Sequence, residues 1–539
     1  MVSPVAETVA TTRTPRSRAS TRRRATFLIL SGSATDEPPN FMTTVSGAGS
    51  GLTLIATIVA VPSVACRTGG YAPRVPRKVM LIGLDCAEPS LVLERWRDEL
   101  PTISGLMERG SYGRLTSVIP PITVPAWSCM MSSKTPGDLG VYGFRNRSDH
   151  TYDGGFIAMS TAIKEPRLWD LVTRAGGSSI VLSVPGCYPP RPLNGVMVGC
   201  FLTPSLDSKY TYPAALKDEI AEVVGEYLFD TKDFRTNDKE YLLRQVYEMT
   251  DRRFALAEHL LETKPWSLFA MVEMGPDRMH HGFWKFMDPE HRKHEPGNAY
   301  ENAILDYHRH VDGLIGKLLA HADEDTVVFI LSDHGAKRLD GGIRINEWLR
   351  SEGLLATLAE PSGVSSLRDV GVDWSRTTAW GEGGYYARVF LNVAGREPEG
   401  TIPPEEYEMV RDDLARRIAA IPDDAGNPIP TAVYKPEELY GEPKGVAPDL
   451  IVVFGDLLWR SVGTIGGDEG IQTLENDTGP DDANHAQDGL YVVAGAGIEA
   501  SGRHDAHLLD IAPTVLELLE IDEPAGMRGS SLLSHSDVS

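Results

Sequence analysis

Short apolar runs separated by helical patterns limit how this chain can fold more than any other feature of its sequence. The runs lie at residues 78–84 (KVMLIGL), 179–184, 267–272, 326–331, 450–453 and 489–494. A strand that is apolar at every position is buried on both faces, as in a parallel sheet covered by helices. Helical patterns that can provide this cover lie at residues 91–106, 250–261, 300–321 and 511–519. We therefore predict an α/β fold with a mostly parallel central sheet flanked by helices.

The residues before the first run have a different character. Residues 1–77 include a stretch rich in Arg, Ser and Thr and an apolar segment at 52–65 (LTLIATIVAVPSVA). This segment is too short to span a bilayer comfortably and resembles the apolar part of a signal peptide in length. We interpret residues 1–77 as a disordered or signal-like extension, or as a wrongly assigned start. One large domain is predicted over residues 78–535, with insertions around 200–250 and 345–480 where the strand rhythm is lost.

The formal net charge of −23 narrows the range of partners. Residues 1–79 hold ten Lys or Arg and only three acids, so the remainder of the chain is strongly acidic. An acidic surface repels nucleic acid, and the residues after 79 lack the basic clusters that bind the phosphate backbone of a nucleic acid. We therefore expect a small-molecule ligand and no nucleic-acid polymer. An acidic protein that handles phosphate needs local positive charge, for which bound metal cations are the simplest source.

The number and spacing of the cysteines indicate in which cellular compartment the protein is found. The chain has 5 cysteines and no C-x-x-C pair, which argues against a disulfide framework and a structural zinc site. We therefore expect a cytoplasmic protein. The alternative is an exported or lipid-anchored protein, with Cys66 after the apolar segment as the attachment residue. No later segment has transmembrane length, and the sequence does not indicate the oligomeric state.

Carboxylates and imidazoles gather at four predicted strand ends. They are Asp85, Asp277, Asp333, His281, His334 and His485. The carboxyl ends of neighbouring parallel strands open one crevice, where such groups can meet. Three carboxylates and three imidazoles can bind two divalent cations, and this mixture suits Zn²⁺, with Mn²⁺ or Fe as alternatives.

Each of these residues also has a simpler interpretation when taken alone. An Asp at a strand end is often a helix N-cap, and a single His such as His485 is often a surface residue. Their joint occurrence at the ends of one sheet favours the metal site. Asp277 and His281 are four residues apart, which places both on one side of a helical turn.

A possible nucleophile lies in the segment 119–128 (IPPITVPAWS). Thr123 lies between Pro121 and Pro125, whose fixed φ angles stiffen the turn. A threonine hydroxyl bound to a metal loses its proton more readily and can attack phosphorus. Ser128 is the rival nucleophile.

With these motifs the chain resembles the alkaline phosphatase superfamily, and most closely its type I phosphodiesterase and nucleotide pyrophosphatase family. The resemblance covers residues 78–533. It extends to the connecting segments LPTISGLMERGSYGRL, NEWLRSEGLL, APDLIVV and DIAPTVLELLEI. It implies an alkaline-phosphatase-like three-layer fold whose catalytic domain spans residues 78–535.

The resemblance also implies a role for individual residues. One metal would be held by Asp85, Thr123, Asp333 and His334, and the other by Asp277, His281 and His485. In that family the threonine forms a covalent phospho-enzyme intermediate, and the metals are usually zinc. Asn146 (FRNRSD) would help to hold the phosphoryl oxygens.

The roles of other residues near these motifs remain open. Arg145 and Arg147, beside Asn146, could contact a phosphate or be solvated loop charges. Cys86 stands where relatives often have Gly, and we interpret it as packing rather than as an additional ligand.

These features predict a metal-dependent hydrolase of phosphodiester or pyrophosphate bonds that acts on a small-molecule phosphoester through a phospho-threonine intermediate. A phosphomonoesterase or phosphomutase of the same superfamily is one alternative. A catalytically silent binding protein is another, although all seven expected positions are filled. The natural substrate and its leaving group are not indicated by the sequence.

Overall fold

The computed structural model describes residues 77–423, 425–467 and 470–533. The interpretation of residues 1–77 as an extension therefore lies, except for residue 77, outside the described residues. Within the described part of the chain, every helix is too short or too polar to span a bilayer.

A ten-stranded sheet forms the centre of the domain. Its parallel strands, in spatial order, are β9 (Thr326–Leu331), β1 (Lys78–Leu84), β8 (Leu268–Glu273), β5 (Ser179–Leu182) and β6 (Gly195–Val198). Beyond them, β19 (Asp488–Gly495) pairs antiparallel with both β9 and β2 (Ser111–Thr116), and β7 (Thr211–Tyr212) pairs antiparallel with β6. The short strands β20 (Gly502–Arg503) and β21 (Ala506–His507) pair with β2. The predicted mostly parallel sheet is confirmed, and the apolar run at 489–494 proves to be one of its antiparallel strands.

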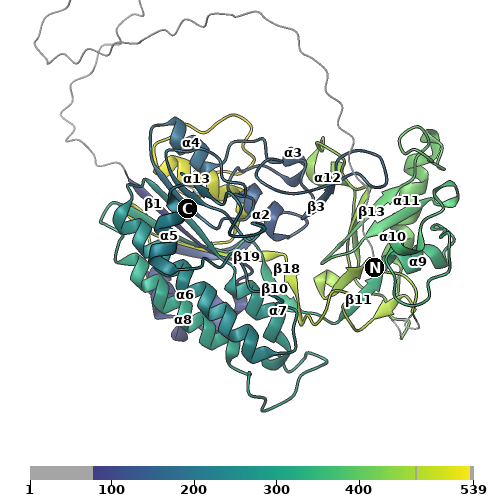
Figure 1. Cartoon of the computed structure of the whole chain (residues 1–539), viewed down its shortest axis with the longest axis horizontal. Helices are drawn as coiled ribbons and strands as arrows, with labels where there is room; N and C mark the ends of the chain where they lie inside the picture. Colours follow the sequence, from purple (N-terminus) through teal and green to yellow (C-terminus); the bar gives the residue numbers. More distant parts are fainter. Residues whose placement is uncertain (1–76, 424, 468–469, 534–539) are drawn as a thin grey trace, which may run out of the picture. The chain divides into compact units, whose positions relative to one another are not determined.

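Helices cover both faces of this sheet, so the strands are apolar at successive positions. In β1, Met80 and Ile82 belong to one apolar cluster and Val79 and Leu81 to the other. The first face is covered by α1 (Pro101–Glu108), α6 (Lys239–Thr263), α7 (Gly275–Met287) and α8 (Ala303–Leu319). The second is covered by α2 (Thr123–Met130), α4 (Leu168–Arg174) and α13 (Ile511–Leu518). Figure 1 shows α6 and α8 on one side of β1 and α4 and α13 on the other.

A second structural region lies between β9 and β19 in the sequence. It contains a four-stranded antiparallel sheet with the order β12 (Ala379–Glu382), β13 (Ala387–Leu391), β15 (Leu450–Val453) and β14 (Ala432–Tyr434). It also contains a three-stranded sheet with the order β16 (Trp459–Val462), β11 (Gly341–Arg344) and β17 (Gln472–Thr473). With α9 (Ile345–Ser351) and α11 (Tyr407–Ala419), the four-stranded sheet encloses its own apolar core. The chain reaches this region through β10 (Gly335–Arg338) and returns through β18 (Ala483–Ala486), which pair with each other.

Several sequence interpretations need correction at this level. The run at 450–453 is a strand, but it belongs to the second sheet instead of the central one. Residues 345–480, where the sequence shows no steady strand rhythm, contain strands that are short and separated by turns, such as β12 and β14. The expected insertion at 200–250 ends early, since α6 begins at Lys239 and packs against the central sheet. The helical pattern at 91–106 divides into η1 (Ser90–Arg95), η2 (Arg97–Glu99) and α1.

The remaining elements are short. They are α3 (Pro136–Leu139), β3 (Arg145–Arg147), β4 (Gly155–Ile157), α5 (Leu216–Val224), α10 (Leu367–Val370), η3 (Trp374–Arg376), η4 (Pro404–Glu406), α12 (Pro436–Tyr440), η5 (Gly455–Leu457) and η6 (Leu508–Asp510).

Candidate metal centre and adjoining cavity

Three adjacent parallel strands bring most of the predicted ligands to one edge of the central sheet. Asp85 follows β1, and Asp333 and His334 follow β9, which pairs with β1. On the other side of β1, strand β8 leads into α7, whose first two turns carry Asp277 and His281. The expected meeting of carboxyl-terminal strand ends is therefore present in the structure.

His485 reaches the same place by a different route. It lies within β18, paired opposite Ala336 of β10, rather than at the end of a central strand. Since β10 follows directly after His334, the ribbon of β10 and β18 carries His485 back toward that histidine. The rings of His334 and His485 stack with their centroids 3.8 Å apart.

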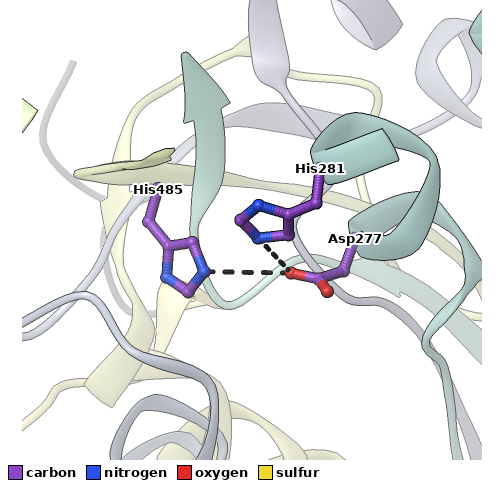
Figure 2. Close-up of side chains that lie close together, drawn as sticks. All are labelled: Asp277, His281 and His485. Carbon is purple, nitrogen blue, oxygen red and sulfur yellow. Dashed lines mark ion pairs between the residues drawn. The ribbon is translucent and has the colours of Figure 1, made fainter. Parts of the chain in front are cut away.

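The six residues form two buried trios. In each trio the potential ligand atoms lie within 4.8 Å of one another. Asp277 Oδ1 is 3.3 Å from His281 Nε2 and 3.8 Å from His485 Nε2, and Figure 2 shows both rings directed at this carboxylate. In the other trio, His334 Nε2 is 3.3 Å from Asp333 Oδ2 and 3.8 Å from Asp85 Oδ1. The stacked rings of His334 and His485 make the two trios neighbours.

The backbone and one carboxylate fix which nitrogen each histidine turns toward its trio. His334 Nδ1 lies 3.1 Å from the Gly335 carbonyl, and His485 Nδ1 lies 2.9 Å from the Pro121 carbonyl. His281 Nδ1 lies 2.7 Å from Asp481 Oδ1. A carbonyl or carboxylate can only accept, so Nδ1 of each ring carries a proton and Nε2 is the nitrogen turned toward the trio.

Several atoms that face the trios have no hydrogen-bond partner within the described part of the chain, although each lies 3.3 to 3.8 Å from another member of its trio. They are Asp85 Oδ1, Asp333 Oδ2 and His281 Nε2, and all three are buried. A buried polar atom without a hydrogen bond costs free energy, and bound cations would satisfy these atoms. Their arrangement, with carboxylate oxygens beside bare imidazole nitrogens, fits divalent metals of the zinc type.

The pKa values of the carboxylates point the same way. Burial raises the pKa of Asp85 well above its ordinary value, and the charge of Asp277 adds to the effect. Burial and the charge of Asp85 likewise raise the pKa of Asp333. Burial would raise the pKa of Asp277 too, but His281 and Arg278 outweigh it and hold that pKa well below its usual range. Three carboxylates this close repel one another, and cations bound between them would relieve that repulsion.

The histidines divide into two kinds. Burial lowers the pKa of His334 to about 4, and burial together with the charge of His334 lowers that of His485 well below its usual value. Burial would lower the pKa of His281 as well, but Asp481 and other nearby acidic groups outweigh it and raise this pKa well above the ordinary value. His334 and His485 are therefore neutral and ready to bind a metal, whereas His281 would give up a proton when a metal binds.

Two supporting residues were not identified from the sequence. The Trp127 indole donates a 2.7 Å hydrogen bond to Asp85 Oδ2, which leaves Oδ1 for the trio. Asp481 accepts from His281 and also contacts Arg235 at 3.2 Å and Arg460 at 3.4 Å. Asp481 is hard to identify from the sequence, because the adjacent Asp482 is also acidic and the pattern does not distinguish them. In the structure Asp482 contacts Lys285 instead.

A buried network sets the start of α7. Glu273, at the end of β8, accepts a 2.8 Å hydrogen bond from the Gly275 amide and is paired with Arg253 at 3.2 Å. Further along, Arg278 contacts Asp277 and forms two hydrogen bonds with Asp230, at 2.8 and 2.7 Å. Arg278 thus helps to orient the Asp277 carboxylate.

Thr123 is the first residue of α2, so it begins a helix and does not lie in the expected turn. Its hydroxyl oxygen lies 3.4 Å from His334 Nε2, and the residue lines a cavity together with Asp277 and His485. The rival Ser128 lies further along α2, is 1% exposed and does not line this cavity. Of the two hydroxyls, only that of Thr123 lies next to the trios.

The cavity beside Thr123 has a volume of about 640 Å³. Its wall is rich in aromatic rings and arginines: Phe144, Phe201, Phe234, Tyr385, Tyr386, Arg145, Arg235, Arg278, Arg388 and Arg460. Residues from the central-sheet region and from the second sheet region both contribute. A cavity of this size holds a small molecule beside the candidate nucleophile.

The side chain of Asn146 forms its hydrogen bonds within its own loop. Its amide accepts a 2.7 Å hydrogen bond from the Tyr142 backbone and donates a 2.8 Å bond to the Gly143 carbonyl. It stabilises its own loop and does not line the cavity that contains Thr123. Its predicted contact with the phosphoryl oxygens therefore stays a prediction.

The neighbours of Asn146 differ from each other. Arg147 is buried against Glu397 at 3.4 Å and lies over the Trp380 ring, so it is structural. Arg145 is exposed and lines the cavity. Cys86 is fully buried with its thiol 3.3 Å from the Gly335 carbonyl, in keeping with the packing role expected for it.

Comparison with known proteins identifies one family. A family model described as type I phosphodiesterase / nucleotide pyrophosphatase matches residues 79–481. Among curated proteins there is no match. Among solved structures, human ectonucleotide pyrophosphatase / phosphodiesterase 5 is 14% identical over 84% of this chain and 97% of its own, with a TM-score of 0.49. Its murine counterpart is 14% identical over 85% and 99%, with a TM-score of 0.48. The match to the family model carries the assignment, not these distant likenesses.

Proposed function

The chain belongs to the type I phosphodiesterase/nucleotide pyrophosphatase family and is a phosphoric ester hydrolase, and on this premise we propose that it cleaves phosphodiester or pyrophosphate bonds with Thr123 as nucleophile and two divalent cations as cofactors. The observation that carries the proposal is the pair of adjacent ligand trios beside Thr123. The substrate is a small-molecule phosphoester bound in the adjoining cavity.

In this proposal Asp85, Asp333 and His334 hold one cation, to which Thr123 is also directed, and Asp277, His281 and His485 hold the other. When bound, the cations supply Lewis acidity toward the phosphoryl oxygens and lower the pKa of the Thr123 hydroxyl. The chain contributes fixed ligand positions, and the N-terminus of α2 favours negative charge on the Thr123 oxygen. Zinc suits the mixed carboxylate and imidazole ligands, with manganese or iron as alternatives.

The reaction then takes two displacements. The Thr123 oxygen releases its proton to solvent and forms a bond to phosphorus while the bond to the leaving oxygen breaks, and the leaving group takes up a proton from solvent. A water oxygen then forms a bond to phosphorus as the bond to the Thr123 oxygen breaks, which releases the phosphoryl product and returns a proton to the Thr123 oxygen. Such transfers depend mainly on positioning and charge stabilisation, which the rigid, buried trios are suited to provide.

Substitution of the nucleophile tests this proposal. We expect Thr123→Ala to lower kcat for bis-p-nitrophenyl phosphate by about a thousandfold or more, because the attacking atom is removed. The bound metal should stay close to the wild-type amount, since six ligands remain. Ser128→Ala serves as the matched control, because Ser128 is a hydroxyl on the same helix that lies outside the cavity. Retained activity in Thr123→Ala, or a comparable loss in Ser128→Ala, would contradict the assignment.

Hydrolysis assays on the purified protein distinguish the alternative functions that the sequence left open. Turnover of a p-nitrophenyl diester faster than p-nitrophenyl phosphate supports the diesterase. The reverse preference indicates a monoesterase, and little hydrolysis of either ester indicates a mutase. A chain that binds no metal and turns over none of these esters would be a silent binding protein.

A further inference from the structure

The cavity beside Thr123 is lined by five arginines, although the protein as a whole is strongly acidic. Three of them are already compensated. Arg278 contacts Asp230 and Asp277, and Arg388 contacts Glu382 and the backbone carbonyl of Arg145. Arg235 contacts Asp481 at 3.2 Å and donates a 2.8 Å hydrogen bond to the Tyr385 hydroxyl oxygen. The remaining two, Arg145 and Arg460, are not compensated in this way.

Arg145 has a free guanidinium group. Among the described residues no hydrogen bond, ion pair or ring contact involves its side chain, which is exposed at the cavity wall. Arg147, on the same short strand β3, is by contrast paired with Glu397. The positive charge of Arg145 is therefore available to something in the cavity.

Arg460 is buried, at 5% exposure, with one weak ionic contact. That contact, 3.4 Å to Asp481, is shared with Arg235 and with His281 Nδ1, which lies closer at 2.7 Å. Within the described part of the chain, Arg460 Nε has no hydrogen-bond partner although it is buried. One carboxylate thus faces four donors, since Asn476 also donates to it at 3.5 Å. Arg460 lies over the neutral Tyr385 ring at 5.4 Å, and its charge is under-compensated.

The carboxylates of the cavity wall do not cancel these charges. Asp230 and Asp277 contact Arg278, and Asp277 also belongs to a ligand trio. Asp477 lines the cavity too, but it is exposed, so water screens its charge. An excess of cationic donors therefore remains beside the candidate nucleophile.

We propose that Arg145 and Arg460 form a subsite for a second anionic group, carried by the part of the substrate that Thr123 does not attack. The preferred substrates are then phosphodiesters or pyrophosphates that bear an additional phosphate or carboxylate. Guanidinium groups bind both of these through paired, charge-assisted hydrogen bonds. The inference rests on the proposed hydrolase function and specifies its substrate class.

Four chromogenic diesters with the same p-nitrophenyl phosphate head and different tails test the proposal. The tails are ethyl, 2-phosphoethyl, 2-carboxyethyl and choline. We expect KM for at least one anionic tail to be about tenfold lower than for ethyl, as one charge-assisted interaction would give. The choline ester should be the poorest, because its tail is cationic. The phosphate and carboxylate tails show which anion the subsite prefers.

Variants of the two arginines identify the subsite. Arg145→Gln should raise KM for the preferred anionic ester about tenfold while kcat, and the kinetics of the ethyl ester, stay unchanged. Arg460→Gln should raise the ratio of KM for the anionic ester to KM for the ethyl ester about tenfold, because this ratio removes any effect that passes through the contact of Arg460 with Asp481. Arg376→Gln is the charge-matched control, because Arg376 lies outside the cavity and its side chain is 76% exposed. If Arg460→Gln fails to fold, Arg460→Lys keeps the charge and removes the paired hydrogen bonds.

A binding measurement separates failure of this inference from failure of the proposed function. Calorimetric titration of metal-loaded Thr123→Ala with the ethyl and anionic esters reports the subsite without catalysis. Equal affinity for charged and uncharged tails would overturn the subsite even if the ethyl ester is hydrolysed. A uniform loss of kcat in Arg145→Gln for all esters would overturn it too, since Arg145 would then act on the reacting phosphoryl group. Absence of hydrolysis with a preserved preference in binding would overturn only the proposed reaction.

Discussion

The hydrogen bond from Trp127 to Asp85 holds one ligand in place. Removing it in Trp127→Phe leaves Asp85 Oδ2 buried without its 2.7 Å partner, so we expect a loss of about 1–3 kcal/mol in the free energy of unfolding and weaker metal binding. Trp169→Phe is the matched control. Trp169 is also buried, in the same apolar cluster, and its indole nitrogen has no partner in the described structure. Equal losses in the two variants, measured by denaturant unfolding and metal titration, would show that the hydrogen bond has no such role.

Asp481 orients His281, and its removal should weaken the cation site formed by Asp277, His281 and His485. We expect Asp481→Ala to lower the affinity of one of the two metals by about 10- to 100-fold, the usual effect of losing a partner that orients a ligand. Competition with a chromogenic chelator measures the affinity of the protein for each of the two metals. Asp482→Asn is the control, since Asp482 contacts Lys285 and no histidine. An unchanged metal affinity in Asp481→Ala would rule out this role.

At the scale of residues, the sequence identified the ligand types but not the residues that support them. Five of the six predicted ligands follow the carboxyl ends of central strands, a pattern that a single sequence reveals, whereas His485 lies within β18. Trp127 and Asp481 act through contacts with Asp85 and His281, which lie far away in the chain. The bonds of Asn146 within its own loop could not be predicted, because an asparagine that stabilises its loop and one that contacts a ligand look alike in sequence.

At the scale of elements, the start of α7 controls the positions of Asp277 and His281. A Cβ added to Gly275 would overlap the Tyr307 hydroxyl and approach Glu273, and both of these side chains are buried. We expect Gly275→Ala to cost about 1–3 kcal/mol of stability and to weaken metal binding, because the helix must shift. Thermal unfolding and metal analysis measure both effects.

Gly313→Ala in α8 is the matched control for that substitution. A Cβ at Gly313 meets nothing within 4 Å, so alanine should stabilise this exposed helical position by about 0.5–1 kcal/mol. A neutral or stabilising effect of Gly275→Ala would mean that the start of α7 is not constrained as described.

The central elements could be predicted and the second sheet could not. The strands β1, β8 and β9 are continuous apolar runs, which only burial on both faces explains. The strands of the second region are shorter, such as β12 with four residues and β14 with three, and turns rich in Gly and Pro separate them. A pattern of that length does not distinguish a strand from a loop.

At the scale of the whole molecule, stability should depend on pH in a way that reveals the metals. The raised pKa values of Asp85, Asp333 and His281 mean that the folded, metal-free protein binds protons that the unfolded chain has already released. Their contribution to stability therefore falls as the pH rises above about 7.5, where the unfolded aspartates and histidines have released their protons. The lowered pKa values of His334 and His485 have almost no effect above about pH 7.5, because both rings are neutral there in the folded and in the unfolded state.

We thus expect the melting temperature of chelator-treated protein to fall more steeply, as the pH rises above about 7.5, than that of metal-loaded protein. The metal-loaded protein is the control for the general effect of its negative charge, because the rest of the molecule is the same. A metal-free protein whose stability rises with pH over this range would contradict the electrostatic account of the site.

The central claim is that two cations lie in two adjacent trios beside Thr123. Anomalous diffraction at the zinc edge, from crystals of protein prepared with zinc, tests it most directly. We predict two peaks, one among Asp85, Asp333 and His334 and one among Asp277, His281 and His485. A single peak, no peak, or peaks away from these residues would contradict the account.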